Sequence, residues 1–376
     1  MTVHATTPTL SPAPHNGAAR SPESSAPTLG TGLARFMAAL RHDRGDATPV
    51  WFMRQAGRSL ASYRALRRRH GFLELCKTPE LAAEVTLLPV AELGVDAAVI
   101  FADIMLPVEP MGLELEMREG VGPVIGNPVR TLDDVERLRP VEPEADLSFV
   151  LDAIRLTRRE LEGKTAVLGF AGAPFTLACY LIEGRPSRDY ARAKALMYGA
   201  PAVWDALMGR LAAVTADYLL AQARAGADAV QLFDSWVGAL SPIDYARYVK
   251  PHVASIFAAL KAAGVPSINF GAETGGLLEV MAAAGGDVIS VDARVPLDAA
   301  WARVGHDRGV QGNLDATRLL GGWTATEEGA RDVLRRAAGR PGHIFNLGHG
   351  VLPETDPALL KRLVDLVHEE TAVPKI

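Results

Sequence analysis

From Thr48 to the C-terminus, short β-branched or apolar runs alternate with longer stretches of helical pattern. There are eight such runs, at residues 50–54, 97–101, 166–170, 229–233, 267–270, 288–291, 310–312 and 344–347. A repeated strand-then-helix order implies parallel pairing, because the helix returns the chain to the same end of the sheet. Eight repeats close a (β/α)8 barrel, so the sequence predicts a single α/β domain of the TIM-barrel class.

Helix starts and one insertion support this prediction. Residues 78–80 supply a threonine cap, a proline suited to the first helical position and an acidic first turn. Pro201, Pro242 and Pro357 each precede apolar residues at helical spacing. The stretch from Leu113 to Val129 differs, because it begins with near-alternating polarity and contains Gly-Pro turn chemistry. It predicts a hairpin inserted after the second strand.

Residues 1–30 have a different composition from the rest of the chain. They are rich in Pro, Ser, Thr and Ala and contain few large apolar side chains, which predicts a disordered tail. The tail has one arginine, Arg20, and an acidic residue, Glu23, a pattern unlike a secretory signal or a transit peptide. We therefore expect a tail over 1–30 and one barrel domain over 31–376.

Composition excludes several classes of protein. The 39 basic and 44 acidic residues give a net charge of −5, the wrong sign for general nucleic-acid binding. No stretch approaches the roughly 20 apolar residues that a membrane span needs. The two cysteines, Cys76 and Cys179, form no CxxC motif, so neither a disulfide framework nor a zinc site is expected. We expect a cytoplasmic protein without metal, nucleic-acid partner or membrane partner.

Polar or glycine-rich positions follow most of the predicted strands. In a barrel, the carboxyl ends of the strands carry the chemistry, so these positions are expected to converge. Each of them taken singly is more often a helix cap than a catalytic group. The positions are Arg54–Gln55, Asp103, 171–174, Asp234–Ser235, Asp292, Asn313 and 348–350.

Asp103 and the neighbouring arginines are the most informative of these positions. Asp103 interrupts the apolar stretch AAVIFADIMLPV, where a carboxylate is costly unless it is hydrogen bonded. A carboxylate satisfied by backbone amides or an arginine, and a catalytic carboxylate, both remain open. Arg54 and Arg58 flank a glycine at the end of the first run, where planar guanidinium groups can hold carboxylates or phosphates. Arg68 and Arg69 on the following helix are expected to form a solvated face.

Three further side chains have several open interpretations. His349 lies in a Gly-His-Gly turn, so catalysis, ligand contact and a backbone hydrogen bond all remain open, with metal binding the weakest. Ser235 follows Asp234 without a GxSxG elbow, which gives nucleophilic catalysis little support. Tyr180 lies in the apolar helix TLACYLIEG, where core packing is expected and the hydroxyl can still reach the barrel mouth.

Six segments carry motifs that together are far more specific than any one alone. On these motifs the chain resembles the uroporphyrinogen decarboxylase family, from Thr48 to the C-terminus. The motifs are PVWFMRQAGR (49–58), IFADI (100–104), GFAGAPFTLACYLIEG (169–184), QLFDSWVGALSP (231–242), QGNLD (311–315) and FNLGHGVLPETDP (345–357).

The resemblance implies a cofactor-free, homodimeric barrel enzyme of porphyrin and haem biosynthesis. Such an enzyme removes the carboxyl groups of the four acetate side chains of uroporphyrinogen III and gives coproporphyrinogen III. It also implies that Asp103 binds the pyrrole NH groups and that Arg54 delivers a proton, although a guanidinium is rarely deprotonated. The catalytic set implied is Asp103, Arg54, Tyr180 and His349. The substrate-binding set implied is Arg54, Gln55, Arg58, Arg67, Asp103, Tyr180, Ser235 and His349.

The chain departs from the family pattern in its loops. Ser59, Ala61 and Ser62 stand where the family often has Tyr, Pro and Glu, Ala293 replaces an expected Trp, and Ala316 replaces a Pro. None of these positions belongs to the implied site, so the departures concern loop packing and the shape of the barrel mouth.

Two alternative functions are considered beside the decarboxylase. A zinc- or corrinoid-dependent methyltransferase shares the barrel, but Cys76 and Cys179 have no His-x-Cys pair with which to hold zinc. A non-catalytic tetrapyrrole carrier would keep the arginines without the chemistry. The presence of Asp103, Tyr180 and His349 together argues weakly against the carrier.

Overall fold

The computed structural model describes residues 30–118 and 120–373, so the predicted tail lies outside the described residues except for Gly30. In the described part, seven parallel strands form one sheet, in the order in which they occur along the chain. The strands are β1 (Ala97–Val99), β4 (Ala166–Gly172), β5 (Ala229–Asp234), β6 (Ser267–Gly271), β7 (Val288–Ser290), β8 (Gly309–Gln311) and β9 (His343–Ile344).

An extended segment around Val50 joins the two ends of this sheet. Val50 pairs in parallel with Phe345, just beyond β9, and the Trp51 N–H donates to the Phe345 carbonyl at 3.3 Å. On its other side, the Asp96 N–H donates to the Val50 carbonyl at 2.8 Å, next to β1. The α/β fold of the TIM-barrel class is confirmed, with one correction. The run 50–54 is no regular strand, because the chain turns away after its single bridge.

Asp96 fastens this segment to two helices. Its Oδ2 accepts a hydrogen bond from the Val50 N–H at 2.7 Å and lies 2.7 Å from His368 Nε2. Its Oδ1 accepts from Arg35 Nη1 at 3.1 Å. Because Asp96 is 2% exposed, these charged bonds are shielded from water. They tie α1 (Gly32–Leu40) and α16 (Pro357–Thr371) to the end of the barrel where β1 begins.

A buried polar network crosses the barrel interior. The Trp51 indole N–H donates to Gln311 Oε1 at 2.9 Å. Gln311 Nε2 then donates to Gln231 Oε1 at 3.0 Å and to Ser290 Oγ at 2.8 Å. These side chains come from the Val50 segment, β8, β5 and β7, so the sheet curls until they meet and fill the centre of the barrel.

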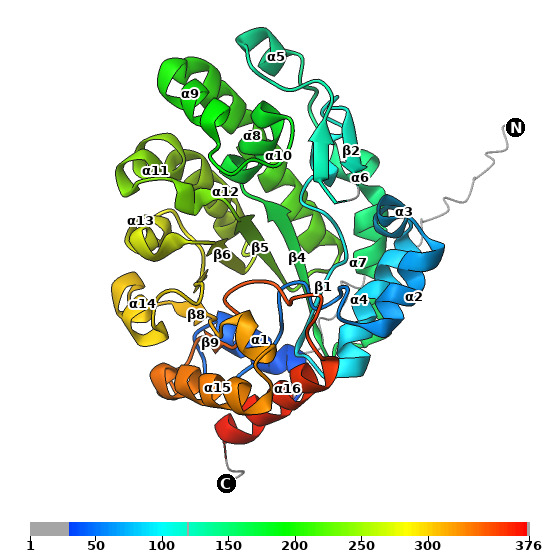
Figure 1. The fold of residues 1–376 in the computed structure, drawn as a ribbon, viewed down its shortest axis with the longest axis vertical. Helices are drawn as coiled ribbons and strands as arrows, with labels where there is room; N and C mark the ends of the chain where they lie inside the picture. Colours follow the sequence, from blue (N-terminus) through cyan, green and yellow to red (C-terminus); the bar gives the residue numbers. More distant parts are fainter. Residues whose placement is uncertain (1–29, 119, 374–376) are drawn as a thin grey trace, which may run out of the picture.

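Helices surround the sheet, as Figure 1 shows. The prolines predicted to open helices do so, because Pro79, Pro201, Pro242 and Pro357 each occupy the first position of a helix. No helix within residues 30–118 and 120–373 is long and apolar enough to cross a membrane. The other helices are α2 (Ala61–Arg69), α3 (Phe72–Lys77), α4 (Pro79–Leu93), α5 (Leu132–Glu136), α6 (Pro143–Asp146), α7 (Ser148–Leu161), α8 (Pro174–Glu183), α9 (Ala191–Gly199), α10 (Pro201–Ala225), α11 (Pro242–Tyr248), α12 (Lys250–Ala262), α13 (Leu278–Ala282), α14 (Leu297–Val304) and α15 (Trp323–Ala337), with short 3-10 turns η1 (Leu106–Val108), η2 (Val237–Ala239), η3 (Thr274–Gly276) and η4 (Ala316–Leu319).

The predicted hairpin insertion is confirmed. Strands β2 (Leu115–Arg118) and β3 (Gly122–Ile125) pair antiparallel, with Leu115 opposite Ile125. The Ile125 N–H donates to the Gly184 carbonyl at 2.8 Å, which docks the hairpin on the end of α8. In Figure 1 the hairpin lies at the periphery, outside the central sheet. It therefore extends the wall beside α8 without entering the barrel.

Candidate active site

Asp103 lies between β1 and η1, at the carboxyl end of the sheet. Its Oδ1 accepts a hydrogen bond from the Met105 N–H at 2.8 Å, whereas no described residue donates to Oδ2. Burial raises the pKa of this carboxyl group, and the Met105 bond and the positive charge of Arg54 oppose the rise. One oxygen thus serves the local turn, and the other is left for a ligand.

Arg54 has an unusual backbone conformation. Its φ of 60° lies in the left-handed region, which is uncommon for a residue other than glycine. The charge of Arg54 contributes to the pKa shifts of Asp103, Tyr180 and His349. Arg54 therefore lies close enough to act through its charge on predicted site residues from three other segments of the chain.

Gln55, in contrast, points into the protein. It is 0% exposed, and its Oε1 accepts from the Phe52 N–H at 3.0 Å. Its Nε2 donates to the carbonyl of Ala97, the first residue of β1, at 2.9 Å. Both the oxygen and the nitrogen of the side-chain amide are thus hydrogen bonded within the protein. This geometry fits a residue that holds the turn before Arg54 in place.

Tyr180 begins a stack of three aromatic rings. Its ring centroid lies 4.0 Å from that of Trp236, and Trp236 lies 5.0 Å from Tyr190. Burial raises the pKa of the Tyr180 phenol to about 12, and the negative charge of Asp103 adds to the rise. The phenol is therefore a neutral hydrogen-bond donor at pH 7, placed beside the carboxylate.

His349 lies in the turn that follows β9. Burial lowers its pKa, and the positive charges of Arg54 and Arg294 lower it further, against the opposing effect of Asp292 and Glu273. The neutral imidazole is consequently favoured at pH 7. His349 can then act as a hydrogen-bond partner without adding charge to the site.

A cavity of about 740 Å³ opens beside His349, whereas Asp103, Arg54 and Tyr180 do not line it. It is lined by segments that follow β5 to β9, including Ser235, Trp236, Asp292 and His349. Gly350 also lines it and lies against the stem of Arg54. The cavity and the Asp103 centre are therefore adjacent parts of one mouth, as expected for the carboxyl ends of barrel strands.

Beneath Ser235, a buried carboxylate supports the wall of the cavity. Asp234 Oδ1 accepts from the Thr176 hydroxyl at 2.7 Å, and Thr176 Oγ1 accepts from the Trp236 N–H at 3.2 Å. Burial raises the pKa of Asp234 to about 7, and the bonds from Thr176 oppose this rise. The pair links the start of α8 to the chain after β5, which fixes the backbone that carries Ser235 and Trp236.

The structure places Arg58 and Arg67 on the exposed surface at and before α2. Both are exposed, and neither lines the cavity. Arg67 lies on α2, where its Nη1 donates to the His70 carbonyl at 2.6 Å and its guanidinium lies 5.9 Å from the centre of the Phe72 ring. Arg58 is in the loop before α2, and its carbonyl accepts from Arg64 at 2.7 Å.

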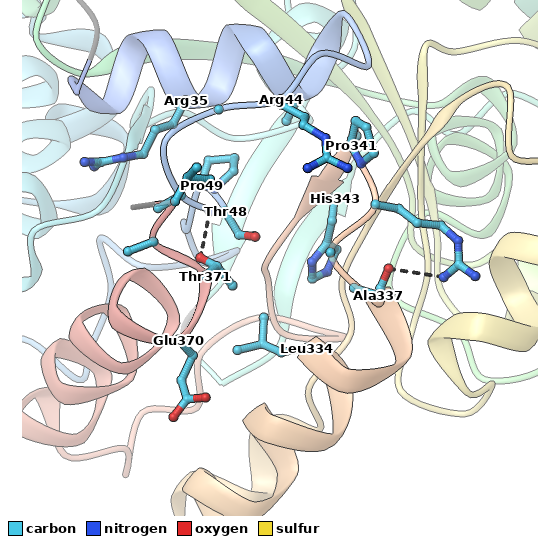
Figure 2. Close-up of a pocket in the computed structure, with 18 of the residues that line it drawn as sticks. Arg35, Arg44, Thr48, Pro49, Leu334, Ala337, Pro341, His343, Glu370 and Thr371 are labelled. Atoms are coloured by element: carbon cyan, nitrogen blue, oxygen red, sulfur yellow. Dashed lines mark hydrogen bonds between the residues drawn. The ribbon is translucent and has the colours of Figure 1, made fainter. Parts of the chain in front are cut away.

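A second cavity, of about 580 Å³, lies at the opposite ends of the strands (Figure 2). Its wall includes His343, the first residue of β9. Three of its arginines are ion-paired, Arg35 with Asp46 at 2.8 Å, Arg331 with Glu370 at 3.1 Å and Arg335 with Asp332. None of the predicted site residues lines this cavity, so it is separate from the candidate active site.

Sequence reasoning missed several residues of the cavity wall. Arg188, Tyr190, Trp236, Glu273 and Arg294 all line it. One signal was available for Trp236, because it directly follows Ser235 in the QLFDSWVG motif. The others lie in loops whose place in the wall depends on how distant segments pack together.

The cysteines are placed as small core residues. Cys76 and Cys179 are both buried and unpaired, and burial raises the pKa of each thiol. Among residues 30–118 and 120–373, no group of three His, Cys, Asp or Glu side chains is arranged to hold a metal ion.

The comparison with known families shows to which family the chain belongs. The family model for uroporphyrinogen decarboxylase (URO-D) matches residues 31–370. The chain belongs to this family. The uroporphyrinogen decarboxylase of Sorangium cellulosum is 58% identical over 334 residues, covering 89% of this chain and 95% of the relative. That of Carboxydothermus hydrogenoformans is 54% identical over 334 residues, with 89% and 95% coverage.

Membership of the uroporphyrinogen decarboxylase family makes this chain a carboxy-lyase of porphyrin biosynthesis. Among solved structures, a methyltransferase from Methanosarcina mazei matches with a TM-score of 0.73, covering 90% of this chain and 99% of its own. Their sequences are 20% identical, so the likeness shows a shared barrel fold and nothing about methyl transfer.

Proposed function

We propose that this enzyme removes the four acetate carboxyl groups of uroporphyrinogen III, without a cofactor, to give coproporphyrinogen III. The observation that carries the proposal is the Asp103 centre. There, a carboxylate with one unbonded oxygen lies within the electrostatic reach of Arg54 and Tyr180. The neighbouring cavity of about 740 Å³ gives the rest of the macrocycle a place to bind.

The chemistry requires a proton and an anion at the same pyrrole ring. Protonation of a ring carbon makes the ring cationic, and the electrons of the C–CO₂⁻ bond then flow into the ring as carbon dioxide leaves. A second proton transfer, to the exocyclic carbon, and loss of the ring proton give the methyl group. Each acetate thus takes up one proton and releases one carbon dioxide, so no oxidant or reductant is needed.

Asp103 is proposed to stabilise the cationic ring. Its free oxygen accepts hydrogen bonds from the pyrrole NH groups before protonation, and its charge acts most strongly once the ring is cationic. At about 4 Å and an effective dielectric constant of about 20, this attraction is worth roughly 4 kcal/mol. That corresponds to about a thousandfold in rate, provided that it is absent from the ground state.

The other side chains have distinct proposed roles around this anion. Arg54 is the proposed proton donor because its charge acts on Asp103, and the Tyr180 phenol is proposed to donate a hydrogen bond from the stacked wall. Neutral His349 and Ser235 contact the substrate from the cavity side. Arg58 and Arg67 attract substrate carboxylates from the exposed loop and α2, which suits a substrate that carries eight carboxylates.

The decisive experiment is an anaerobic incubation of the protein with uroporphyrinogen III, with and without chelator. The oxidised products are then separated by carboxyl number. We expect a progression from eight carboxyl groups to four that the chelator does not change. Tight binding without conversion would instead show a tetrapyrrole carrier, and conversion that stops with chelator would show a metal requirement.

The oligomeric state is a second part of the proposal. We propose a homodimer, by analogy with the family, and expect sedimentation at working concentration to give twice the chain mass. A monomer under those conditions would contradict this part and leave the proposed reaction unaffected.

A further inference from the structure

One cation in the cavity wall has no role in the site described so far. Arg188 lies in the loop between α8 and α9 and lines the cavity together with Tyr190 and Ser235. Its side chain is exposed and makes no hydrogen bond or ion pair with residues 30–118 or 120–373. An unpaired guanidinium in a cavity wall is a ready partner for an anionic ligand.

The acidic residues of the cavity are already engaged by their neighbours. Asp292 accepts hydrogen bonds from the N–H groups of Glu273 at 2.5 Å and Arg294 at 2.9 Å. Glu273 pairs with the Arg294 guanidinium at 3.0 Å. Asp315 accepts from the N–H and the hydroxyl of Thr317 at 2.9 Å and 2.8 Å. These local bonds leave the charge of Arg188 available to a ligand.

The loop that carries Arg188 is held in a defined shape. Tyr190 has a left-handed backbone, with φ of 52°, and its N–H donates to Ser187 Oγ at 3.0 Å. Its ring packs on Trp236, and its carbonyl accepts from the Lys194 N–H at 2.9 Å. Because Arg188 lies between Ser187 and Tyr190, these contacts limit where its side chain can reach.

The aromatic stack connects this loop to the reaction centre. At one end, the pKa of Tyr180 responds to Asp103 and Arg54. At the other end, the pKa of Tyr190 responds to Glu273, which lines the cavity. The wall formed by Tyr180, Trp236 and Tyr190 thus runs from the carboxylate toward Arg188. It offers an apolar surface on which a pyrrole ring of the macrocycle can pack.

We propose that Arg188 binds a carboxylate of the porphyrinogen on a pyrrole ring other than the one held at Asp103. This inference rests on the proposed function, because it requires a substrate that is larger than the Asp103 centre and carries several carboxylates. Arg188 sets the orientation of the macrocycle along the aromatic wall. It therefore contributes to substrate binding, and the chemical step at Asp103 does not depend on it.

The test compares Arg188→Ala with Arg185→Ala under anaerobic assay conditions. Arg185 is a matched control, because it is an exposed arginine of the same loop that does not line the cavity. We expect Arg188→Ala to raise KM about three- to tenfold, the effect of one charged hydrogen bond reduced by solvent exposure. The kcat should stay within about twofold, because the residue acts on binding.

Two further readouts separate binding from a structural effect. Arg188→Lys should recover part of the KM change, because it keeps the charge and loses the planar fork. The KM difference between Arg188→Ala and wild type should shrink at high salt, since an exposed charge is screened. A KM for Arg188→Ala equal to that of Arg185→Ala would overturn the proposal.

Porphyrinogens with different numbers of carboxyl groups identify which substrate carboxylate Arg188 binds. Acetates are lost during the reaction and propionates remain, so KM is measured for both the octacarboxylate and the pentacarboxylate porphyrinogen. An equal rise for both identifies a propionate, and a larger rise for the octacarboxylate identifies an acetate.

A failure of this inference is distinguishable from a failure of the proposed function. Uroporphyrin III, the stable oxidised macrocycle, is titrated against each variant by tryptophan fluorescence quenching. If the wild-type protein binds uroporphyrin but does not turn over uroporphyrinogen, the proposed reaction is wrong. Weaker binding of uroporphyrin by Arg188→Ala would then still support the role of Arg188. If the wild-type protein turns over uroporphyrinogen and Arg188→Ala binds uroporphyrin as tightly as wild type, only the role of Arg188 is wrong.

Discussion

Gly350 lies against the aliphatic stem of Arg54, so close that a β-carbon at position 350 would be 2.5 Å from Arg54 Cδ. A glycine is thus required for Arg54 to occupy its place beside Asp103. We expect Gly350→Ala to displace the guanidinium and to lower kcat/KM about a hundredfold, the effect of misplacing a reacting group by roughly 1 Å. Steady-state kinetics with uroporphyrinogen III would measure this.

Gly209→Ala is the control for that prediction. Gly209 lies within α10, where an added β-carbon meets no heavy atom within 4 Å. This variant should keep wild-type kinetics and gain a little stability, because alanine favours a helix interior. Wild-type kcat/KM in Gly350→Ala would show that the position of the Arg54 stem does not matter to the reaction.

Asp103→Asn should separate catalysis from folding. Asparagine keeps an oxygen that can accept from the Met105 N–H but carries no charge. We expect kcat to fall about a thousandfold, since roughly 4 kcal/mol of cation stabilisation is lost. Binding of uroporphyrin should fall far less. A parallel loss of binding and turnover would favour a carrier.

The same variant gives a stability prediction with a definite sign. Burial raises the pKa of Asp103 in the folded protein, so its contribution to stability is present at low pH and is lost as the pH rises through the folded pKa. Asp103→Asn removes that loss. We therefore expect its Tm at pH 7 to equal or exceed that of wild type, and a lower Tm would indicate a structural role for the carboxylate.

Gln55→Leu tests whether this residue positions the loop or binds substrate. The change leaves the Phe52 N–H and the Ala97 carbonyl without their partner in a buried place. The free energy of unfolding should fall by about 1–3 kcal/mol, measured by urea denaturation, and kcat should fall with it. A rise in KM alone, with stability unchanged, would instead assign Gln55 to direct substrate contact.

Because His343 is buried, we expect the free energy of unfolding to fall in acid. The imidazole Nε2 lies 3.0 Å from the Gly312 carbonyl, and burial lowers the pKa of His343 to about 4. The unfolded chain takes up this proton near pH 6.5, so stability falls as the pH drops from about 6.5 to 4, by roughly 3 kcal/mol in total.

Urea unfolding of wild type and His343→Gln across this pH range checks the prediction. The difference in unfolding free energy between the two proteins should change along the acid slope. It should be constant between pH 7.5 and 8.5, where the histidine is neutral in both states. A constant difference down to pH 4 would contradict the assignment.

The barrel, the helix starts and the hairpin could be predicted because their signals are local. A proline at a first helical position or an alternating run acts through neighbouring residues. The first run, 50–54, was the exception. Its composition indicates a strand, but the backbone leaves the sheet after Val50 and turns into the left-handed conformation at Arg54. That turn depends on packing with β1 and with the segment after β9.

In the candidate site, too, some features follow from the local sequence and others depend on tertiary packing. Arg54 and Gln55 are adjacent polar residues in the sequence. In the structure the arginine is exposed at the mouth, whereas the glutamine is 0% exposed beneath it. The polar positions after the strands were recognisable from the sequence. Arg188 and Tyr190 were not, because they follow α8 in a loop whose shape is set by the contacts of Tyr190 with Trp236 and Ser187.

The sequence by itself determined the fold class and the family of this protein, since periodicity, caps and ordered motifs are written in the order of the residues. Tertiary structure alone decided which side chains share a space. The charge of Arg54 acts on Asp103, Tyr180 and His349, and Gly350 makes room for Arg54 from a distant part of the chain. Such relationships depend on backbone direction and barrel closure, which bring together segments that the sequence keeps apart.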